Sequence, residues 1–197
     1  MKKFFSVFAA VFAGVLLCGC AASPEPILMS EVFQLKKDQK IRTAYNIWYT
    51  DPANVDCRNV QQGSFIPLGT EITPVSADNT TRKITFKAQG KTFTIHFKSG
   101  IRLSTMRDYI ADTFTSKTPE EIFKDIPENV RRRIERGEVV PGMTRPQVLL
   151  EYGPPPAART PDTRNETWIY WRSPESQIRV IFRDDVVRNV FTFNNEQ

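Results

Sequence analysis

The sequence predicts an α+β protein in which a β-rich part, a helical connector and a second sheet follow one another along the chain. Three observations support this fold class. Short runs of β-branched and aromatic residues occupy residues 41–100, helix caps recur from residue 101 onwards, and three strand-like runs lie at the C-terminal end. With 197 residues, of which 40% are hydrophobic, the chain has room for one moderate domain or two small ones.

The first residues have the features of an export signal. Lys2 and Lys3 precede an apolar run at residues 4–17, and small residues follow it. The apolar run is too short to span a bilayer comfortably, which is typical of a secretory signal. We therefore expect residues 1–19 to be a signal peptide that is removed from the protein.

The end of this segment, Leu17-Cys18-Gly19-Cys20, resembles the lipobox of bacterial lipoproteins. Cys20 is the expected lipidation site, because processing at Cys18 would place Leu17 at the small-residue position before the cut. The resemblance implies a covalent lipid on Cys20 that anchors the protein to a membrane. An aspartate after the modified cysteine retains enterobacterial lipoproteins in the inner membrane, so Ala21 implies the periplasmic face of the outer membrane.

The net charge of the chain is mild. The formal charge is +5, and removal of the two signal-peptide lysines leaves 25 basic residues against 22 acidic residues. Proteins that bind nucleic acid usually concentrate basic residues on one face, and a periplasmic address also argues against such a partner. We therefore expect a membrane and envelope proteins as partners, and no nucleic acid.

Catalytic and metal-binding groups are sparse. Once Cys18 is removed and Cys20 is lipidated, Cys57 is the only thiol, so it is either buried or paired with another chain. His96 is the only histidine and has no nearby cysteine or acidic cluster to complete a metal site. An enzyme would need Cys57 as nucleophile and His96 as base, although no motif surrounds either residue. We expect no enzyme, no metal and no cofactor apart from the lipid.

The β-rich part is expected at residues 41–100, behind a tether at residues 20–40 that holds the fold away from the lipid. Strand-like runs lie at residues 43–49, 63–75, 84–88 and 93–97, and Gln89-Gly90 is a hairpin signal between the last two. His96 lies opposite the apolar residues of its strand, so it should face solvent or a partner. The spacing predicts a small antiparallel domain, either a strongly bent sheet or an SH3-like barrel.

Residues 101–126 are expected to form a helical connector. Ser104 can cap a helix that ends near Thr113. The motif Thr118-Pro119-Glu120-Glu121 combines a Thr cap, a proline at the first helical position and a glutamate three residues after the cap, which is a capping box.

Residues 127–197 are expected to form the C-terminal unit. One helix begins at Pro127-Glu128, and another lies between the N-cap Thr144 and Gly153, followed by two prolines. Strands are predicted at residues 166–172, 177–183 and 186–193. Because the connecting turns are short, we expect sequential antiparallel pairing, with one helical layer on one face of the sheet.

A specific series of motifs runs through this unit. It consists of a Gly-Met-Thr helix start, a Gly-Pro helix end, an aromatic strand and a last strand after an acidic turn, here residues 142–144, 153–154, 167–171 and 179–190. This series resembles the BamE (SmpA/OmlA) lipoprotein family over about residues 127–193, roughly a third of the chain. The resemblance implies two helices with a three-stranded antiparallel sheet and a role in outer-membrane β-barrel assembly. The same small fold also occurs in protein inhibitors, so protein binding is the more general implication.

Candidate interaction residues lie in three places. Trp48 and Tyr49 can stack on sugar rings if they are exposed, although aromatic residues more often pack in a core. The outer face of the final sheet is a second place. The third is a basic helix face made of Arg131, Arg132, Arg133 and Arg136. This face suits lipid headgroups, anionic glycans or an acidic partner, or it is a solvated face neutralised by neighbouring glutamates.

Taken together, these features favour a non-enzymatic outer-membrane lipoprotein that binds a protein partner and acts as an assembly or stability factor of the cell envelope. β-Barrel protein assembly is the role that the BamE resemblance implies. The alternative is a periplasmic lipoprotein module that binds peptidoglycan or a small ligand, based on the SH3-like interpretation of residues 41–100.

Overall fold

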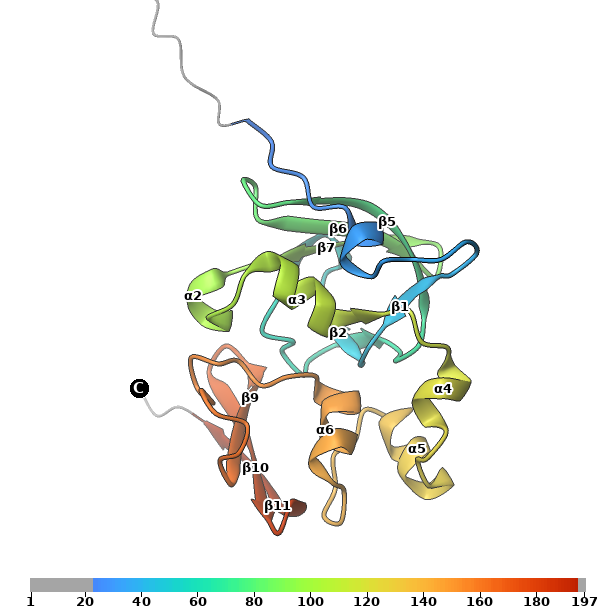
Figure 1. Cartoon of the computed structure of the whole chain (residues 1–197). Helices are drawn as coiled ribbons and strands as arrows, with labels where there is room; N and C mark the ends of the chain where they lie inside the picture. The colour runs from blue at the N-terminus through green and yellow to red at the C-terminus, as the bar shows by residue number, and fades with distance from the viewer. Residues whose placement is uncertain (1–22, 195–197) are drawn as a thin grey trace, which may run out of the picture.

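Two hydrophobic cores organise the chain, and each has its own β-sheet (Figure 1). A computed structural model describes residues 23–194, so the expected signal peptide at residues 1–19 and the expected lipidation site Cys20 lie outside the described residues. The helices are α1 (Met29–Val32), the 3-10 turn η1 (Pro52–Asn54), α2 (Ser99–Arg102), α3 (Met106–Thr113), α4 (Pro119–Phe123), α5 (Glu128–Ile134) and α6 (Arg145–Tyr152). The strands are β1 (Ile41–Thr43), β2 (Ile47–Tyr49), β3 (Val55–Asp56), β4 (Ser64–Ile66), β5 (Glu71–Asp78), β6 (Lys83–Ala88), β7 (Lys91–His96), β8 (Phe114–Thr115), β9 (Thr167–Ser173), β10 (Ser176–Arg183) and β11 (Val186–Asn194). The predicted α+β class is therefore confirmed.

The first sheet is curled and has the strand order β3-β7-β6-β5-β1-β8 (Figure 1). The hairpin predicted at Gln89-Gly90 joins β6 to β7, and both turn residues have a positive φ, of 49° and 74°. Ile84 and Phe86 of β6 are fully buried beside Ile95 of β7. One pairing differs from the expected antiparallel sheet, because β3 runs parallel to β7. A separate two-stranded sheet pairs β2 with β4.

Residues 27–33, which were predicted as part of a tether at residues 20–40, instead pack on the first core. The Ile27 N–H donates to the carbonyl of Ala77 at 2.8 Å, and Met29 of α1 is only 3% exposed in the first core. Ile27 and Phe33 also pack against this core. The apolar residues of this stretch therefore cover the curled sheet. The polar residues between them had made the stretch look like a solvent-exposed linker.

The expected connector at residues 101–126 also differs from the structure in its first half. Tyr109 and Ile110 of α3 are buried in the first core, and Phe114 begins β8, which pairs with β1. Helix α3 starts one residue later than predicted, because Thr105 and Asp108 form a reciprocal capping box. The capping box predicted at residues 118–121 is confirmed at the start of α4.

The second sheet has the order β11-β10-β9 and is antiparallel throughout. Its strands agree with the predicted ranges to within one residue at each end. Trp168, Tyr170 and Phe182 fill its buried face, and Val148 and Tyr152 of α6 belong to the same core. Helix α6 begins after the predicted N-cap Thr144, whose backbone N–H donates to the side chain of Gln147 at 2.9 Å, and it ends at Gly153.

A seam of buried polar side chains joins the two cores. Asn46 lies between β1 and β2, where the single strand predicted at residues 43–49 is broken, and it is 1% exposed. Its Nδ2 donates to the Ile134 carbonyl at 2.7 Å and to the carboxyl group of Glu151. Its Oδ1 accepts from the Leu68 N–H at 2.7 Å. One amide side chain therefore satisfies groups from α5, α6 and the loop after β4, which a continuing strand would leave unpaired.

Two further side chains extend this seam. The Nδ2 of Asn59 donates to the Tyr152 carbonyl at 3.0 Å. Arg102 is 6% exposed; its Nε donates to the carbonyl of Cys57 and its Nη1 to the carbonyl of Pro154, both at 2.8 Å. Both residues belong to the part of the chain that forms the first core, and they bond the backbone at the end of α6 and just after it, so the end of that helix is fixed against the first core.

The chain reversal after α6 needs glycine for two reasons. Gly153 has φ 70° and ψ −175°, a combination that is essentially restricted to glycine. A Cβ at this position would also lie 2.7 Å from the ring of Tyr45, which is buried in the first core. Gly153 thus lets the two cores approach each other.

We predict that Gly153→Ala lowers the free energy of unfolding by roughly 3 kcal/mol, because it combines backbone strain with overpacking. Gly90→Ala is the matched control, since Gly90 also has a positive φ but has no atom within 4 Å of an added Cβ. The control should cost only about 1–2 kcal/mol. Denaturant unfolding of both variants measures the difference, and equal losses would show that the contact with Tyr45 contributes nothing.

The carboxyl group of Glu151 is the most perturbed acid of the seam. The side chain is fully buried, and burial raises its pKa from 4.5 to about 9 despite the opposing donors of Asn46 and Trp48. The indole of Trp48 is near enough to act on this pKa, although Trp48 Nε1 and Glu151 Oε1 do not reach the geometry of a full hydrogen bond. Glu151 is therefore neutral in the folded protein near pH 7.

This shift predicts a pH dependence of stability. The folded state keeps a proton on Glu151 that the unfolded state releases above about pH 4.5, so the contribution is complete at low pH and is lost as the pH rises towards 9. Glu151→Gln imitates the neutral carboxyl, and it should raise the free energy of unfolding at pH 8 by roughly 1–3 kcal/mol while flattening its pH profile. Glu135→Gln on the exposed side of α5 is the control. A parallel pH profile for Glu151→Gln and the parent would contradict the assignment.

Candidate interaction surface

The second sheet has one buried face and one outer face. Ile178, Val180 and Phe182 point into the core, so the residues between them on β10 point outwards. The strand register places the neighbours of those residues on the same side. We define the outer face as Ile169, Trp171, Arg179, Ile181, Arg183, Phe191 and Phe193.

Aromatic rings and arginines alternate across this outer face. The guanidinium of Arg179 lies 4.6 Å from the ring centre of Phe193, and Phe191 lies 6.0 Å from Phe193 between ring centres. Phe191 and Phe193 are each 43% exposed. Arginines that stack on aromatic rings keep their charge available while their planes stay ordered.

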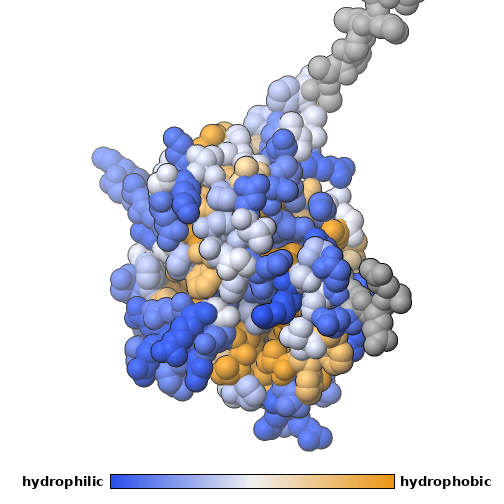
Figure 2. Space-filling view, turned by 180° about the vertical axis from the view of Figure 1, so that it is seen from behind, coloured by the Kyte–Doolittle hydropathy of each residue, from blue (hydrophilic) through white to orange (hydrophobic). Residues whose placement is uncertain are grey.

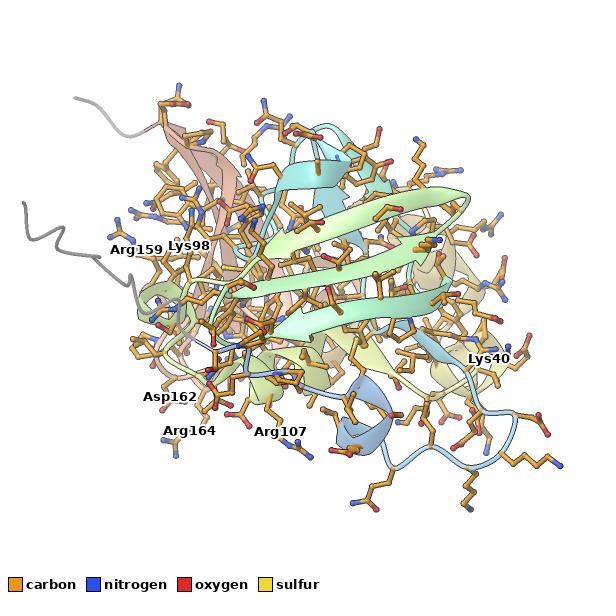
Figure 3. The ribbon with its side chains drawn as sticks, turned by 90° about the horizontal axis from the view of Figure 1, so that it is seen from above. Lys40, Lys98, Arg107, Arg159, Asp162 and Arg164 are labelled. Atoms are coloured by element: carbon orange, nitrogen blue, oxygen red, sulfur yellow. The ribbon has the colours of Figure 1, made fainter. Side chains whose placement is uncertain are left out.

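Trp171 forms the other end of this aromatic row. The guanidinium groups of Arg58 and Arg159 lie 5.2 Å and 5.6 Å from its ring centre. Figure 3 shows Arg159 projecting outwards on the side of the molecule that holds the second sheet, whereas Lys40 projects on the opposite side. Positive charge therefore lies at both ends of the aromatic row, from Arg179 beside Phe193 and from Arg58 and Arg159 beside Trp171.

The charge of the three strands has a single sign. β9, β10 and β11 contain Arg172, Arg179, Arg183 and Arg188 and have no acidic residue. Arg188 lies 3.8 Å from Asp184 in the adjoining turn, but within residues 23–194 neither Arg179 nor Arg183 has a carboxylate within 4 Å. An uncovered sheet face with exposed aromatic rings and unpaired arginines can bind an acidic protein surface.

Trp48 and Tyr49, the two aromatic residues predicted to contact a ligand, lie outside the outer face and are only half exposed. Trp48 packs on Phe65 at 4.8 Å between ring centres, and a Cβ on Gly137 would lie 2.6 Å from its ring. Tyr49 packs edge-on against Phe93 of the first core. The free edge of Trp48 also lines a groove of about 490 Å³ whose other walls are mainly polar, with Gln61, Gln62, Gly63, Arg172, Ser173, Ser176, Thr192 and Asn194.

The predicted arginine cluster lies on and just after α5. Three of its members are paired with glutamates, namely Arg131 with Glu135, Arg132 with Glu128 and Arg133 with Glu138. This region forms the hydrophilic lower-left corner of Figure 2, beside a hydrophobic patch on the lower part of the molecule. The half-buried hydrophobic residues that pack on the second core include Val130, Val140, Leu149, Leu150 and Val190.

In the part of the chain that the structure describes, no hydrogen bond joins Cys57 to His96. Cys57 is fully buried, and burial raises the pKa of its thiol. His96 lies opposite Asp56 in the register of β3 and β7, and its Nε2 is 3.4 Å from the Ala53 carbonyl. Within residues 23–194 no group of three or more His, Cys, Asp or Glu residues is placed to hold a metal ion. No helix in the same range is long and apolar enough to cross a membrane.

Comparisons of the chain with protein-family models, with curated proteins and with solved structures found no match.

The outer face of the final sheet was predicted as a candidate surface, but the absence of acidic residues from its three strands is a further signal that the prediction did not use. Arginine-rich strands without acidic residues are unusual for a solvated sheet surface, where charges of both signs are normally mixed. Phe191 and Phe193 were expected only as members of a strand, because their exposure depends on which parity of β11 faces the core. The bulge between Ile181 and Phe182 changes that parity, and sequence alternation alone does not locate it.

We predict that Phe191→Ser and Phe193→Ser each change the free energy of unfolding by less than about 1 kcal/mol, because both rings already contact water. Phe182→Ser is the matched control, since Phe182 is 1% exposed and its loss should cost more than about 3 kcal/mol. Losses of similar size in all three variants, measured by denaturant unfolding, would assign Phe191 and Phe193 to the core instead of the outer face.

Proposed function

We propose that the chain is a non-enzymatic outer-membrane lipoprotein, anchored by a lipid on Cys20, that binds a protein partner as an assembly or stability factor of the bacterial envelope. The observation that carries this proposal is the outer face of the second sheet, where exposed phenylalanines and unpaired arginines lie on strands without acidic residues. Such a face suits recognition of an acidic protein surface better than contact with solvent alone.

The arrangement of the chain fits an anchored binding protein. The described chain begins at the top of Figure 1, whereas β9, β10 and β11 lie at the bottom, beyond the first core. A lipid on Cys20, only a few residues before the described chain, would place the first core next to the membrane. The outer face would then stand away from the lipid surface, within reach of other envelope proteins.

We further propose that the C-terminal part has a BamE-like fold. The support is the chain order of α5, α6, β9, β10 and β11, together with the capped start of α6 and its end at Gly153. β-Barrel protein assembly is one role that this proposal would include. The longer first part, with its own core, distinguishes this chain from a lone BamE-like unit.

The proposal predicts a covalent adduct with an envelope protein when a photo-crosslinking residue replaces Phe191 in the full chain in living cells. The same residue at Lys91, on the first sheet, is the control and should give no adduct. Cys20→Ala should abolish incorporation of labelled palmitate, release the protein from membranes and reduce the adduct from position 191.

Absence of any protein adduct from position 191 would contradict the proposed function. An adduct with peptidoglycan fragments would instead favour the alternative of a wall- or small-ligand-binding module, which the polar groove beside Trp48 supports. Unchanged membrane association of Cys20→Ala would contradict the lipid anchor.

A further inference from the structure

Strand β11 has an open edge for most of its length. It lies at the margin of its sheet, with β10 on one side only. At its start the edge is covered, because the Val187 N–H donates to the Met143 carbonyl at 2.8 Å and the Val187 carbonyl accepts from the Gly142 N–H at 2.9 Å. Beyond Val187, within residues 23–194, no backbone hydrogen bond joins β11 to any segment other than β10.

The side chain of Ser176 identifies which backbone groups point to this open edge. Ser176 lies on β10, and its Oγ donates to the Phe193 carbonyl at 3.2 Å, so the backbone groups of Phe193 point towards β10. The N–H and C=O groups of successive strand residues point to alternate sides. The backbone groups of Thr192 and Val190 therefore point outwards.

The bulge in this sheet agrees with that assignment. Val187 and Val190 both direct their backbone groups to the open edge, although they are three residues apart. A regular strand does not allow this, but an extra residue opposite Ile181 and Phe182 does. The open edge therefore begins directly after the bulge.

The charges around the edge define what it can accept. Arg179 leans from β10 onto the ring of Phe193, so its guanidinium lies over β11, and Arg188 lies on β11 itself. A second copy of the chain at this edge would bring arginines against arginines, which is unfavourable. An extended acidic segment would supply both the missing backbone partners and the opposite charge.

We propose that an extended acidic segment of the partner protein pairs with β11 as a fourth strand, with its backbone bonded to Val190 and Thr192 and its carboxylates near Arg179 and Arg188. This inference rests on the proposed protein-binding function and adds the chemistry of the partner. The exposed rings of Phe191 and Phe193 lie on the same strand and would contact apolar residues that alternate with the acidic ones.

The test uses the full chain in cells, with the photo-crosslinking residue at position 191. Thr192→Pro removes the outward N–H and keeps the bonds to β10, whereas Thr192→Val keeps the N–H and the branched shape. We expect Thr192→Pro to lower the yield of the adduct about tenfold and Thr192→Val to leave it unchanged. The crosslinked peptide of the partner, sequenced by mass spectrometry, should contain alternating Asp or Glu residues.

Several results would overturn the inference. An adduct that persists in Thr192→Pro would do so, and in that case the proposed protein-binding function would stand. Loss of the adduct in both Thr192 variants would also overturn it, as would an adduct with a second copy of this chain or with a segment that lacks acidic residues.

Proline can disturb the fold, so a second measurement is needed. Hydrogen exchange of the Val190 and Thr192 amides should slow about tenfold or more when the crosslinked partner peptide is added to the purified full chain in detergent micelles. Unchanged exchange at both amides would overturn the inference whatever the outcome for Thr192→Pro.

Discussion

The structure depends on a small set of buried polar side chains that join its two cores. Asn46 donates to the Ile134 carbonyl and accepts from the Leu68 N–H, and both of these partners belong to the second core. Asn59 and Arg102 hold the backbone where α6 ends. Buried amide and guanidinium groups are costly unless they are bonded, so their partners must lie at definite places. Hydrophobic packing alone would allow the two cores to slide, whereas these directional bonds fix one relative position. The price of this arrangement is the fully buried carboxyl group of Glu151, which stays neutral in the seam.

This fixed position determines what the second sheet exposes. Helix α6 packs on one face of the sheet and is held at its end by the first core, whereas Arg179, Arg183, Phe191 and Phe193 on the opposite face stay exposed. This opposite face is also the one with stacked arginines and aromatic rings. A stable seam and an accessible sheet surface are thus two consequences of the same packing. In the proposed role, the first core acts as a spacer between the membrane and the binding surface.

Local signals in the sequence predicted local structure well. The capping box at Thr118, the N-cap at Thr144, the hairpin at Gln89-Gly90 and the three final strands all depend on residues close together in the chain, and they are present. Long-range contacts were harder to predict. Met29 and Tyr109 belong to the first core although they precede and follow the predicted β domain, because burial of an apolar side chain is decided by distant partners. The break at Asn46 has the same origin, since its bonds reach residues far along the chain. The outer face depends on both local and long-range features. The positive charge of its strands can be read from the sequence, but which residues of β11 point outwards depends on the bulge in the sheet.

The buried polar seam should make the two cores one cooperative unit, and the chain carries natural probes for both cores. The three tryptophans are Trp48 at the seam and Trp168 and Trp171 on β9, whereas Cys57 is buried in the first core. Equilibrium unfolding in denaturant should therefore be followed by tryptophan fluorescence and, in parallel, by thiol labelling of Cys57 assigned by peptide mass. Coincident midpoints are expected for the two probes, because a cooperative unit unfolds in a single transition. Labelling of Cys57 at a denaturant concentration at which the tryptophan signal is still native would show that the cores unfold separately, and would contradict the claim.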